Sequence, residues 1–377
     1  MEPIYLDNQA STPMDDRVVE AMAAAGYGNP HATGHSVGWA ASAKVEEARA
    51  SVAALIGADP DEIFFTSGAT ESNNLAILGV RAFRHEGRDV VMRPPTEHKS
   101  VLAACEALAE EYGFKVDSIP VGADGRIDLS HFDRSALDRV ALISVALVNN
   151  EIGTVQDIGA IGGRRGSALF HCDAAQAPEA VDMAGTASHC DMMSLSSHKM
   201  GGPMGIGALY VARPVQKRIR PIMYGGGQQS GIRPGTLPLQ LCVGMGVACD
   251  IAREGAAARK IVASMRDAFL EALTHQGLRF RLNGASDLGN RHPGNANIRL
   301  DGVDAEQLIA LLQPRVAAST GSACNSGNLE PSHVLTSIGL THEEAAQSIR
   351  FSIGHQITEA DIREAAQMIA DAIMRLA

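Results

Sequence analysis

Lys199 is the residue whose type and setting point most directly to chemistry. It follows the strand-like run DMMSLSS at 191–197 and precedes a glycine-rich turn. A lysine amine at the end of a strand can form a covalent bond to a carbonyl group. Most lysines in that setting are ordinary surface residues, so the assignment depends on which other groups the fold brings to the same place.

Three further segments supply groups that would complement such a lysine. Asp173 ends another apolar run, where its carboxylate can pair with a protonated ring nitrogen or simply cap a helix. Residues 66–70, TSGAT, offer backbone N–H groups at a predicted helix start, which suits a phosphate but also an ordinary cap. His98 follows a third run, as a stacking imidazole or a structural loop histidine. A lysine, an acid, a phosphate cradle and a stacking ring are together what pyridoxal phosphate requires.

Alternating helices and strands are predicted for the part of the chain that carries these residues. An amphipathic pattern at 40–57 ends at a glycine, and a second helix is expected at 69–83. Strands are predicted at 62–68, 139–151, 168–176, 191–199 and 205–212. This alternation indicates an α/β domain with a mainly parallel sheet.

Polar residues follow three of these strands, and the C-terminal third has a different pattern. The polar groups lie at 149–150, 173–176 and 196–199, where the carboxyl ends of parallel strands form the usual binding crevice. Residues 241–277 predict a long helix, straight or bent, that leads to a smaller α+β domain. We expect a large domain over 15–257 and a small domain formed by 1–14 and 258–377.

Composition excludes several classes of partner. The net charge of -11 and the lack of a basic run disfavour a nucleic acid. No apolar stretch is long enough to span a membrane, and the N-terminal residues carry no secretory signal, so we expect a cytoplasmic protein. The six cysteines are scattered without a CxxC pair, so neither a metal site nor a disulfide framework is predicted.

Cys324 differs from the other cysteines in its surroundings. A free cysteine is usually a small buried hydrophobe. Cys324 instead lies in AASTGSACNSGNLEP, at 317–331, a run of small residues that has little to bury. We expect this run to be an exposed, mobile loop, in which an accessible thiolate can react.

Ten stretches of the sequence, in this order, resemble a known family. They are YLDNQASTP (5–13), GNPHATGHSVG (28–38), FTSGATESNN (65–74), TEHKSVL (96–102), VNNEIGTVQ (148–156), HCDAAQ (171–176), SSHKMGGPMGIGALYV (196–211), GGGQQSGIRPGT (225–236), STGSACNSGNLEPSHVL (319–335) and RFSIG (350–354). The sequence is similar to the class I cysteine desulfurases, pyridoxal-phosphate enzymes that supply sulfur for iron–sulfur clusters. The resemblance implies a fold type I, aspartate aminotransferase-like transferase.

The resemblance also implies roles for residues around the cofactor. Lys199 would hold pyridoxal phosphate covalently, Asp173 would pair with its ring nitrogen, and His98 would stack on the ring and handle protons. The hydroxyl side of the ring would be contacted by Asn150 and Gln176. The phosphate would be held by Ala69, Thr70, Ser196 and His198, with Thr236 reaching the phosphate of the other subunit in a homodimer.

Substrate and sulfur roles follow from the same resemblance. Arg350 would pair with the carboxylate of L-cysteine, and Asn8 and Asn149 are lesser candidates for that pocket. Cys324 would attack the substrate sulfur and carry it as a persulfide to an acceptor protein, such as an iron–sulfur scaffold. The alternatives are a selenocysteine lyase, another fold type I enzyme such as a small aminotransferase, or a non-enzymatic binding platform.

Overall fold

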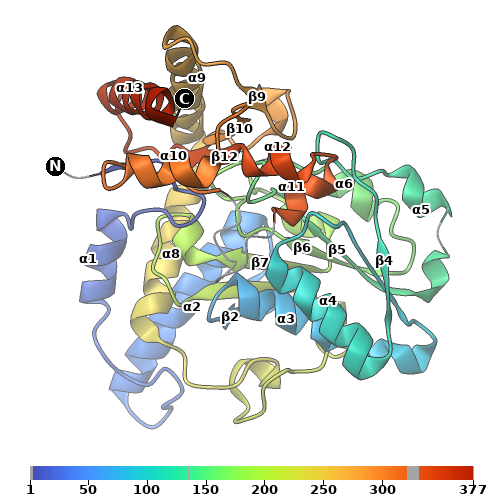
Figure 1. Cartoon of the computed structure of the whole chain (residues 1–377). Coiled ribbons are helices and arrows are strands. Elements are labelled where there is room, and N and C mark those ends of the chain that lie inside the picture. The colour runs from blue at the N-terminus through green and yellow to red at the C-terminus, as the bar shows by residue number, and fades with distance from the viewer. Residues whose placement is uncertain (1–2, 135, 321–330, 377) are drawn as a thin grey trace.

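A seven-stranded sheet forms the centre of the computed structural model, which describes residues 3–134, 136–320 and 331–376 (Figure 1). The strand order is β2-β8-β7-β6-β5-β3-β4. The strands are β2 (Ile63–Thr66), β3 (Val90–Arg93), β4 (Lys115–Ser118), β5 (Val140–Ala146), β6 (Leu169–Asp173), β7 (Met192–Ser196) and β8 (Gly207–Val211). Only β8 runs antiparallel to its neighbours, β2 and β7, so the predicted mainly parallel sheet is confirmed.

Helices cover both faces of this sheet (Figure 1). One face packs on α1 (Asp16–Ala24), α2 (Ser36–Ile56) and α8 (Leu239–Glu254), and the other on α3 (Ala69–Gly79) and α4 (Lys99–Tyr112). Alternate strand residues face opposite cores, as Phe65 and Phe64 of β2 show. Burial on both faces explains why the strands appear in the sequence as continuous apolar runs.

A second sheet, of three antiparallel strands, packs with the C-terminal helices. It contains β9 (Arg281–Leu282), β10 (Asn295–Arg299) and β12 (Ser348–Ser352), in the order β12-β10-β9. Its helices are α9 (Ala256–His275), α10 (Ala305–Leu312) and α13 (Glu359–Leu376). Phe269 and Phe351 meet edge to face at 5.1 Å in this core, which the N-terminal residues Ile4 and Leu6 also enter. The division of the chain at 15 and 257 stays a prediction.

Shorter elements complete the chain. Strand β1 (Ile4–Tyr5) pairs in parallel with β11 (Val316–Ala317). The short helices are α5 (Ser130–Arg134), α6 (Ile158–Gly162), α7 (Arg213–Gln216), α11 (His333–Ser337) and α12 (His342–Ala346). The 3-10 turns are η1 (Pro60–Glu62), η2 (Val80–Glu86), η3 (Leu137–Arg139), η4 (Thr186–His189), η5 (Ser197–Lys199), η6 (Gln228–Gly231) and η7 (Leu288–Asn290).

The predicted helices are found with corrected bounds. Helix α2 ends at Gly57, whose φ of 75° is the left-handed conformation that glycine adopts most readily. The helix expected at 69–83 stops at Gly79 and continues as a 3-10 turn. The helix expected over 241–277 is two helices, α8 and α9, because Gly255 interrupts the helical bonding between them. Within the described residues, no helix combines the length and the apolar character needed to cross a membrane.

A buried polar ladder crosses the sheet at His171, two residues before the end of β6. Its Nδ1 lies 2.9 Å from the hydroxyl of Ser144 on β5, and its Nε2 lies 2.9 Å from the hydroxyl of Ser194 on β7. Burial lowers the pKa of His171 to about 4, although the nearby Asp173 opposes the shift. The neutral imidazole therefore joins three neighbouring strands below the polar ends of β5, β6 and β7.

His171 should make the folded protein sensitive to acid. The unfolded chain protonates this ring near pH 6.5, whereas the folded protein resists protonation down to about pH 4. Stability is therefore lost as the pH falls between these values, by about 3 kcal/mol. Urea unfolding from pH 7 to pH 4 should show this loss in the wild type and a smaller one in His171→Gln. The exposed His275→Gln is the control, and equal pH dependence of His171→Gln and wild type would refute the assignment.

Candidate active site

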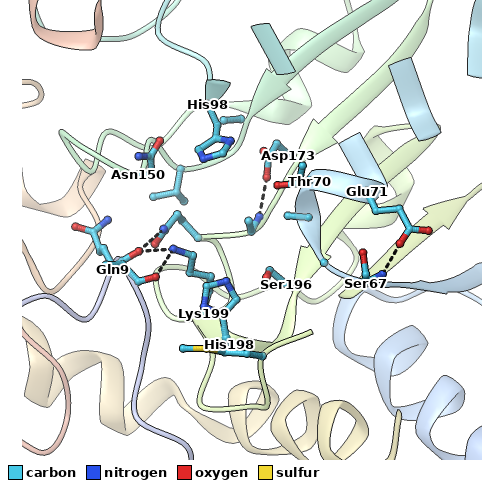
Figure 2. A pocket seen from close by; sticks show the side chains of 18 of the residues that line it. Gln9, Ser67, Thr70, Glu71, His98, Asn150, Asp173, Ser196, His198 and Lys199 are labelled. Carbon is cyan, nitrogen blue, oxygen red and sulfur yellow. Dashed lines mark hydrogen bonds between the residues drawn. The ribbon is translucent and has the colours of Figure 1, made fainter. Parts of the chain in front are cut away.

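A cavity of about 470 Å³ opens where β5, β6 and β7 end (Figure 2). The N-terminal segment and the start of α3 form two of its walls, and β12 contributes one residue. Among the cavity-lining residues are ten that were predicted: Ala69, Thr70, His98, Asn150, Asp173, Gln176, Ser196, His198, Lys199 and Arg350. The polar groups that follow separate strands in the sequence thus meet at one edge of the sheet.

The amine of Lys199 reaches across the cavity to the N-terminal segment. The residue ends the 3-10 turn η5, which directly follows β7. Its Nζ donates hydrogen bonds to the carbonyl oxygens of Gln9 and Ala10, each at 2.7 Å (Figure 2). The side chain of Gln176 donates to the same Gln9 carbonyl at 2.8 Å. Two predicted site residues therefore converge on Gln9, which was not among the predicted site residues.

A chain of hydrogen bonds joins Asp173 to His98. The Asn73 amide on α3 donates to Asp173 Oδ2 at 2.8 Å and to the Ser100 hydroxyl at 2.9 Å. That hydroxyl lies 2.7 Å from His98 Nδ1. The other oxygen of Asp173 accepts the N–H of Ala175 at 3.0 Å in a turn, so the carboxylate does not cap a helix. Asn73 therefore fixes the acid relative to the imidazole.

His98 is a neutral ring that begins helix α4. Burial lowers its pKa; the charge of Asp173 opposes this shift, and that of Lys199 adds to it. Its Nδ1 accepts the backbone N–H of Ser100 at 3.1 Å. The neutral tautomer therefore carries its hydrogen on Nε2, from which it can be donated.

The start of α3 forms a cradle for an anion. Gly68 precedes the helix with a φ of 150°, a conformation that side-chain-bearing residues rarely adopt, and a Cβ there would meet open space. The first N–H groups of an 11-residue helix favour a phosphate. Glu71 orders this turn, because it accepts the Ser67 N–H at 2.7 Å and pairs with Arg233.

Ser196 and His198 line the cavity near Lys199 (Figure 2). Burial, followed by the charge of Lys199, lowers the pKa of His198 to about 4, so its ring is neutral at pH 7. A neutral imidazole can donate a hydrogen bond to a phosphate. The Lys199 amine, the Asp173 carboxylate, the His98 imidazole and the N–H groups at the start of α3 together fit pyridoxal phosphate.

Arg350 brings the three-stranded sheet to the cavity. It lies in β12 and is only 5 % exposed. Its Nη1 donates to the carbonyl oxygen of Asn150 at 2.8 Å, and its Nη2 pairs with Asp7 Oδ1 at 2.6 Å. The guanidinium can therefore bind the carboxylate of a ligand held near Lys199.

Four predicted site residues are not among those that line the cavity. Thr236 is exposed. The side-chain amide of Asn8 donates to Tyr5 and Ser352, and that of Asn149 donates to Thr96, in each case to the backbone carbonyl. These amides hold the backbone, and the roles of Asn8 and Asn149 as lesser candidates for the substrate pocket stay a prediction. Cys324 lies outside the described residues.

Three residues that contact predicted site residues were not predicted individually: Asp7, Gln9 and Asn73. All three lie inside stretches that carry the resemblance, YLDNQASTP and FTSGATESNN. That membership was the only signal for them, because each acts through a contact with a residue far away in the sequence.

Comparison with known proteins decides the family. Residues 4–364 match the aminotransferase class-V family. The chain is 45% identical to the cysteine desulfurase IscS of Rickettsia bellii over 380 residues, which are 99% of this chain and 92% of that protein. The chain belongs to the class I cysteine desulfurases. The members of this family use pyridoxal phosphate, which the residues of the cavity fit.

Solved structures agree with this membership. A NifS-like protein superposes with a TM-score of 0.90 at 30% identity, covering 100% of both chains. A structure described as SspA in complex with cysteine has a TM-score of 0.81 at 36% identity, covering 93% of this chain and 98% of that one. The fold is therefore that of this desulfurase family, fold type I, as the sequence predicts.

Asn73→Ala should weaken the retention of the cofactor, because it removes the amide that donates hydrogen bonds to both Asp173 and Ser100. An unsatisfied buried acceptor costs about 1–3 kcal/mol. We expect Asn73→Ala to lose pyridoxal phosphate faster than the wild type on dialysis, and the loss can be measured by visible absorption. Asn74→Ala is the control, because within the described residues that side chain donates to Thr70 of its own helix. Equal retention by the two variants would contradict a role for Asn73 in holding the acid.

Proposed function

We propose that this protein removes sulfur from L-cysteine, leaving L-alanine, and passes the sulfur on from a persulfide at Cys324. The observation that carries the proposal is that Lys199, Asp173 and Arg350 line one cavity in a chain of the desulfurase family. An amine, a ring-directed acid and a carboxylate receptor are what an amino-acid substrate and pyridoxal phosphate require.

We propose the following roles for the cavity residues. Bound pyridoxal phosphate supplies an electron sink when the Cα–H bond of an amino acid breaks. Lys199 would hold the cofactor covalently, and Asp173 would keep its ring nitrogen protonated. Asn150 and Gln176 would contact the ring hydroxyl. The phosphate would bind to Ala69, Thr70, Ser196 and His198.

The substrate would be oriented by Arg350 and His98. Arg350 would bind its carboxylate, which fixes the Cα–H bond relative to the Lys199 amine. His98 would stack on the ring and donate a hydrogen bond through its Nε2–H in the cavity, because its lowered pKa keeps the imidazole neutral.

Cys324 would perform the sulfur transfer. Its thiolate would form a bond to the substrate sulfur while the substrate Cβ–S bond breaks, so the sulfur leaves as a persulfide. The electron pair of the broken bond would stay with Cβ, which takes up a proton and becomes the methyl group of alanine. The five other cysteines are buried free thiols. For Cys105, Cys172, Cys190, Cys242 and Cys249, burial raises the pKa and so disfavours the thiolate.

Replacing the proposed nucleophile should separate binding from turnover. Cys324→Ser should still bind L-cysteine, seen as a change in visible absorption, and should release almost no alanine, because a serine hydroxyl is a far weaker nucleophile toward sulfur. Wild-type protein treated with L-cysteine should carry one extra sulfur on the peptide that contains Cys324. Cys105→Ala is the control. A Cys324→Ser protein with near wild-type turnover would overturn the mechanism and favour a selenocysteine-lyase-like reaction.

We propose that the protein is a homodimer in which Thr236 reaches the phosphate bound to the other subunit. The exposure of Thr236 on the glycine-rich segment supports a contact made outside its own cavity.

Subunit exchange tests this shared site. Mixed dimers of Lys199→Ala and Thr236→Ala have one cavity with both lesions and one with neither, so activity should reappear on mixing. The recovery should approach half of the wild-type activity per mixed dimer. No recovery despite exchange, confirmed by mass spectrometry, would show that Thr236 acts within its own subunit.

We also propose that the protein works in the cytoplasm and delivers sulfur to an acceptor protein, such as an iron–sulfur scaffold. The five free buried thiols support a reducing compartment. Alanine and sulfide release from L-cysteine, measured with and without candidate acceptors, tests both the activity and the transfer.

A further inference from the structure

We propose that Asp7 is a positioning residue that orients Arg350 for the substrate carboxylate. This inference rests on the proposed function, because it concerns how an amino-acid substrate is bound. Asp7 belongs to the segment that follows β1, and its carboxylate pairs with Nη2 of Arg350 at 2.6 Å. Among the described residues, it provides the carboxylate that forms an ion pair with this guanidinium.

Two contacts on opposite terminal nitrogens hold the guanidinium plane. Nη2 donates to Asp7, and Nη1 donates to the Asn150 carbonyl at 2.8 Å. The third nitrogen, Nε, is buried and has no hydrogen-bond partner among the described residues. Each terminal nitrogen has two hydrogens, so one on each stays available for a two-point bond to a carboxylate. Without Asp7, the neutral Asn150 carbonyl would be the remaining hydrogen-bond partner of the guanidinium within the described residues.

The charge of Asp7 also suits this position. The charge of Arg350 also acts on a second carboxyl group, that of Glu151. Burial raises the pKa of Glu151 to about 7, so this group is only partly ionised at neutral pH. A buried guanidinium needs an anionic partner when no substrate is bound. Asp7, whose side chain is 20% exposed, meets that need beside the cavity.

The backbone around Asp7 is held independently of its side chain. The N–H of Leu6 donates to Ala317 at 2.9 Å, and the N–H of Asn8 donates to Ser352 at 3.1 Å. The backbone N–H of Ser352 in turn donates to the Leu6 carbonyl at 2.7 Å. These bonds attach the segment to both β11 and β12. A substitution of the Asp7 side chain should therefore leave the path of the chain, and the Lys199 contacts at Gln9 and Ala10, in place.

A ligand that has a carboxylate and a ligand that has none distinguish orientation from general damage. L-alanine, the proposed product, carries the carboxylate, whereas cysteamine carries only the amine and thiol. Their dissociation constants can be measured from the visible absorption of the cofactor-loaded enzyme. Asp7→Ala should raise the dissociation constant of L-alanine, and KM for L-cysteine, on the order of tenfold, with little change in kcat. The dissociation constant of cysteamine should not change.

Asp7→Asn should restore part of the L-alanine affinity, because its amide oxygen can still accept from Nη2 although the negative charge is lost. Asp16→Asn, on the exposed face of α1, removes the same charge elsewhere and should match the wild type. Equal weakening of L-alanine and cysteamine, or unchanged L-alanine affinity in Asp7→Ala, would overturn the proposal. The melting temperature of each variant shows whether it is folded. If Asp7→Ala is misfolded, Asp7→Asn provides the test. An Asp7→Asn protein that binds L-alanine as weakly as Asp7→Ala would refute orientation by Asp7. Wild-type protein that binds L-alanine without converting L-cysteine would instead refute the proposed function.

Discussion

The arrangement of the cavity depends on the N-terminal segment, whose Gln9 carbonyl accepts a hydrogen bond from Gln176 and whose Gln9 and Ala10 carbonyls lie beside the Lys199 amine. These carbonyls belong to the N-terminal segment, which other bonds attach to the three-stranded sheet. The Gln9 N–H donates to the Ser352 hydroxyl at 2.9 Å, and Asn295 on β10 donates to Gln9 Oε1 at 2.6 Å. One short segment therefore sets the distance between the lysine that follows β7 and the arginine on β12.

The buried carboxyl group of Glu97 stabilises one wall of the cavity. Glu97 accepts the N–H of Ala146 at 2.9 Å, at the end of β5, and its backbone carbonyl lies 2.9 Å from Nε2 of His333 on α11. Burial raises the pKa of Glu97 to about 8, an effect that the nearby Asp173 reinforces and Arg93 opposes. The carboxyl is therefore largely protonated at neutral pH, so it stabilises the wall without adding a second full charge beside Asp173. These contacts fix the positions of the polar groups in the cavity before any ligand binds.

The sequence was sufficient for five of the seven strands of the sheet, but not for β3 and β4, and for the family and ten of the residues that line the cavity. Strand ends carry local signals: an apolar run followed by polar groups predicts Asp173 and Lys199 at the same edge of a parallel sheet. Asp7, Gln9 and Asn73 could not be predicted in this way, because their contacts join segments that are about 27 to 343 residues apart in the chain. No local pattern encodes such a distance. The break at Gly255 was missed because a period of 3.6 residues continues on both sides of it.

The central claim is that Lys199 holds pyridoxal phosphate opposite Asp173. Borohydride reduction of the cofactor-loaded enzyme makes the bond between lysine and cofactor permanent, and mass spectrometry of the peptides then locates it. We expect the added mass on the peptide that contains Lys199, at one per subunit. Lys99, which directly follows His98, is the competing lysine in the sequence. Added mass on Lys99 or on another lysine, with Lys199 unmodified, would contradict the account.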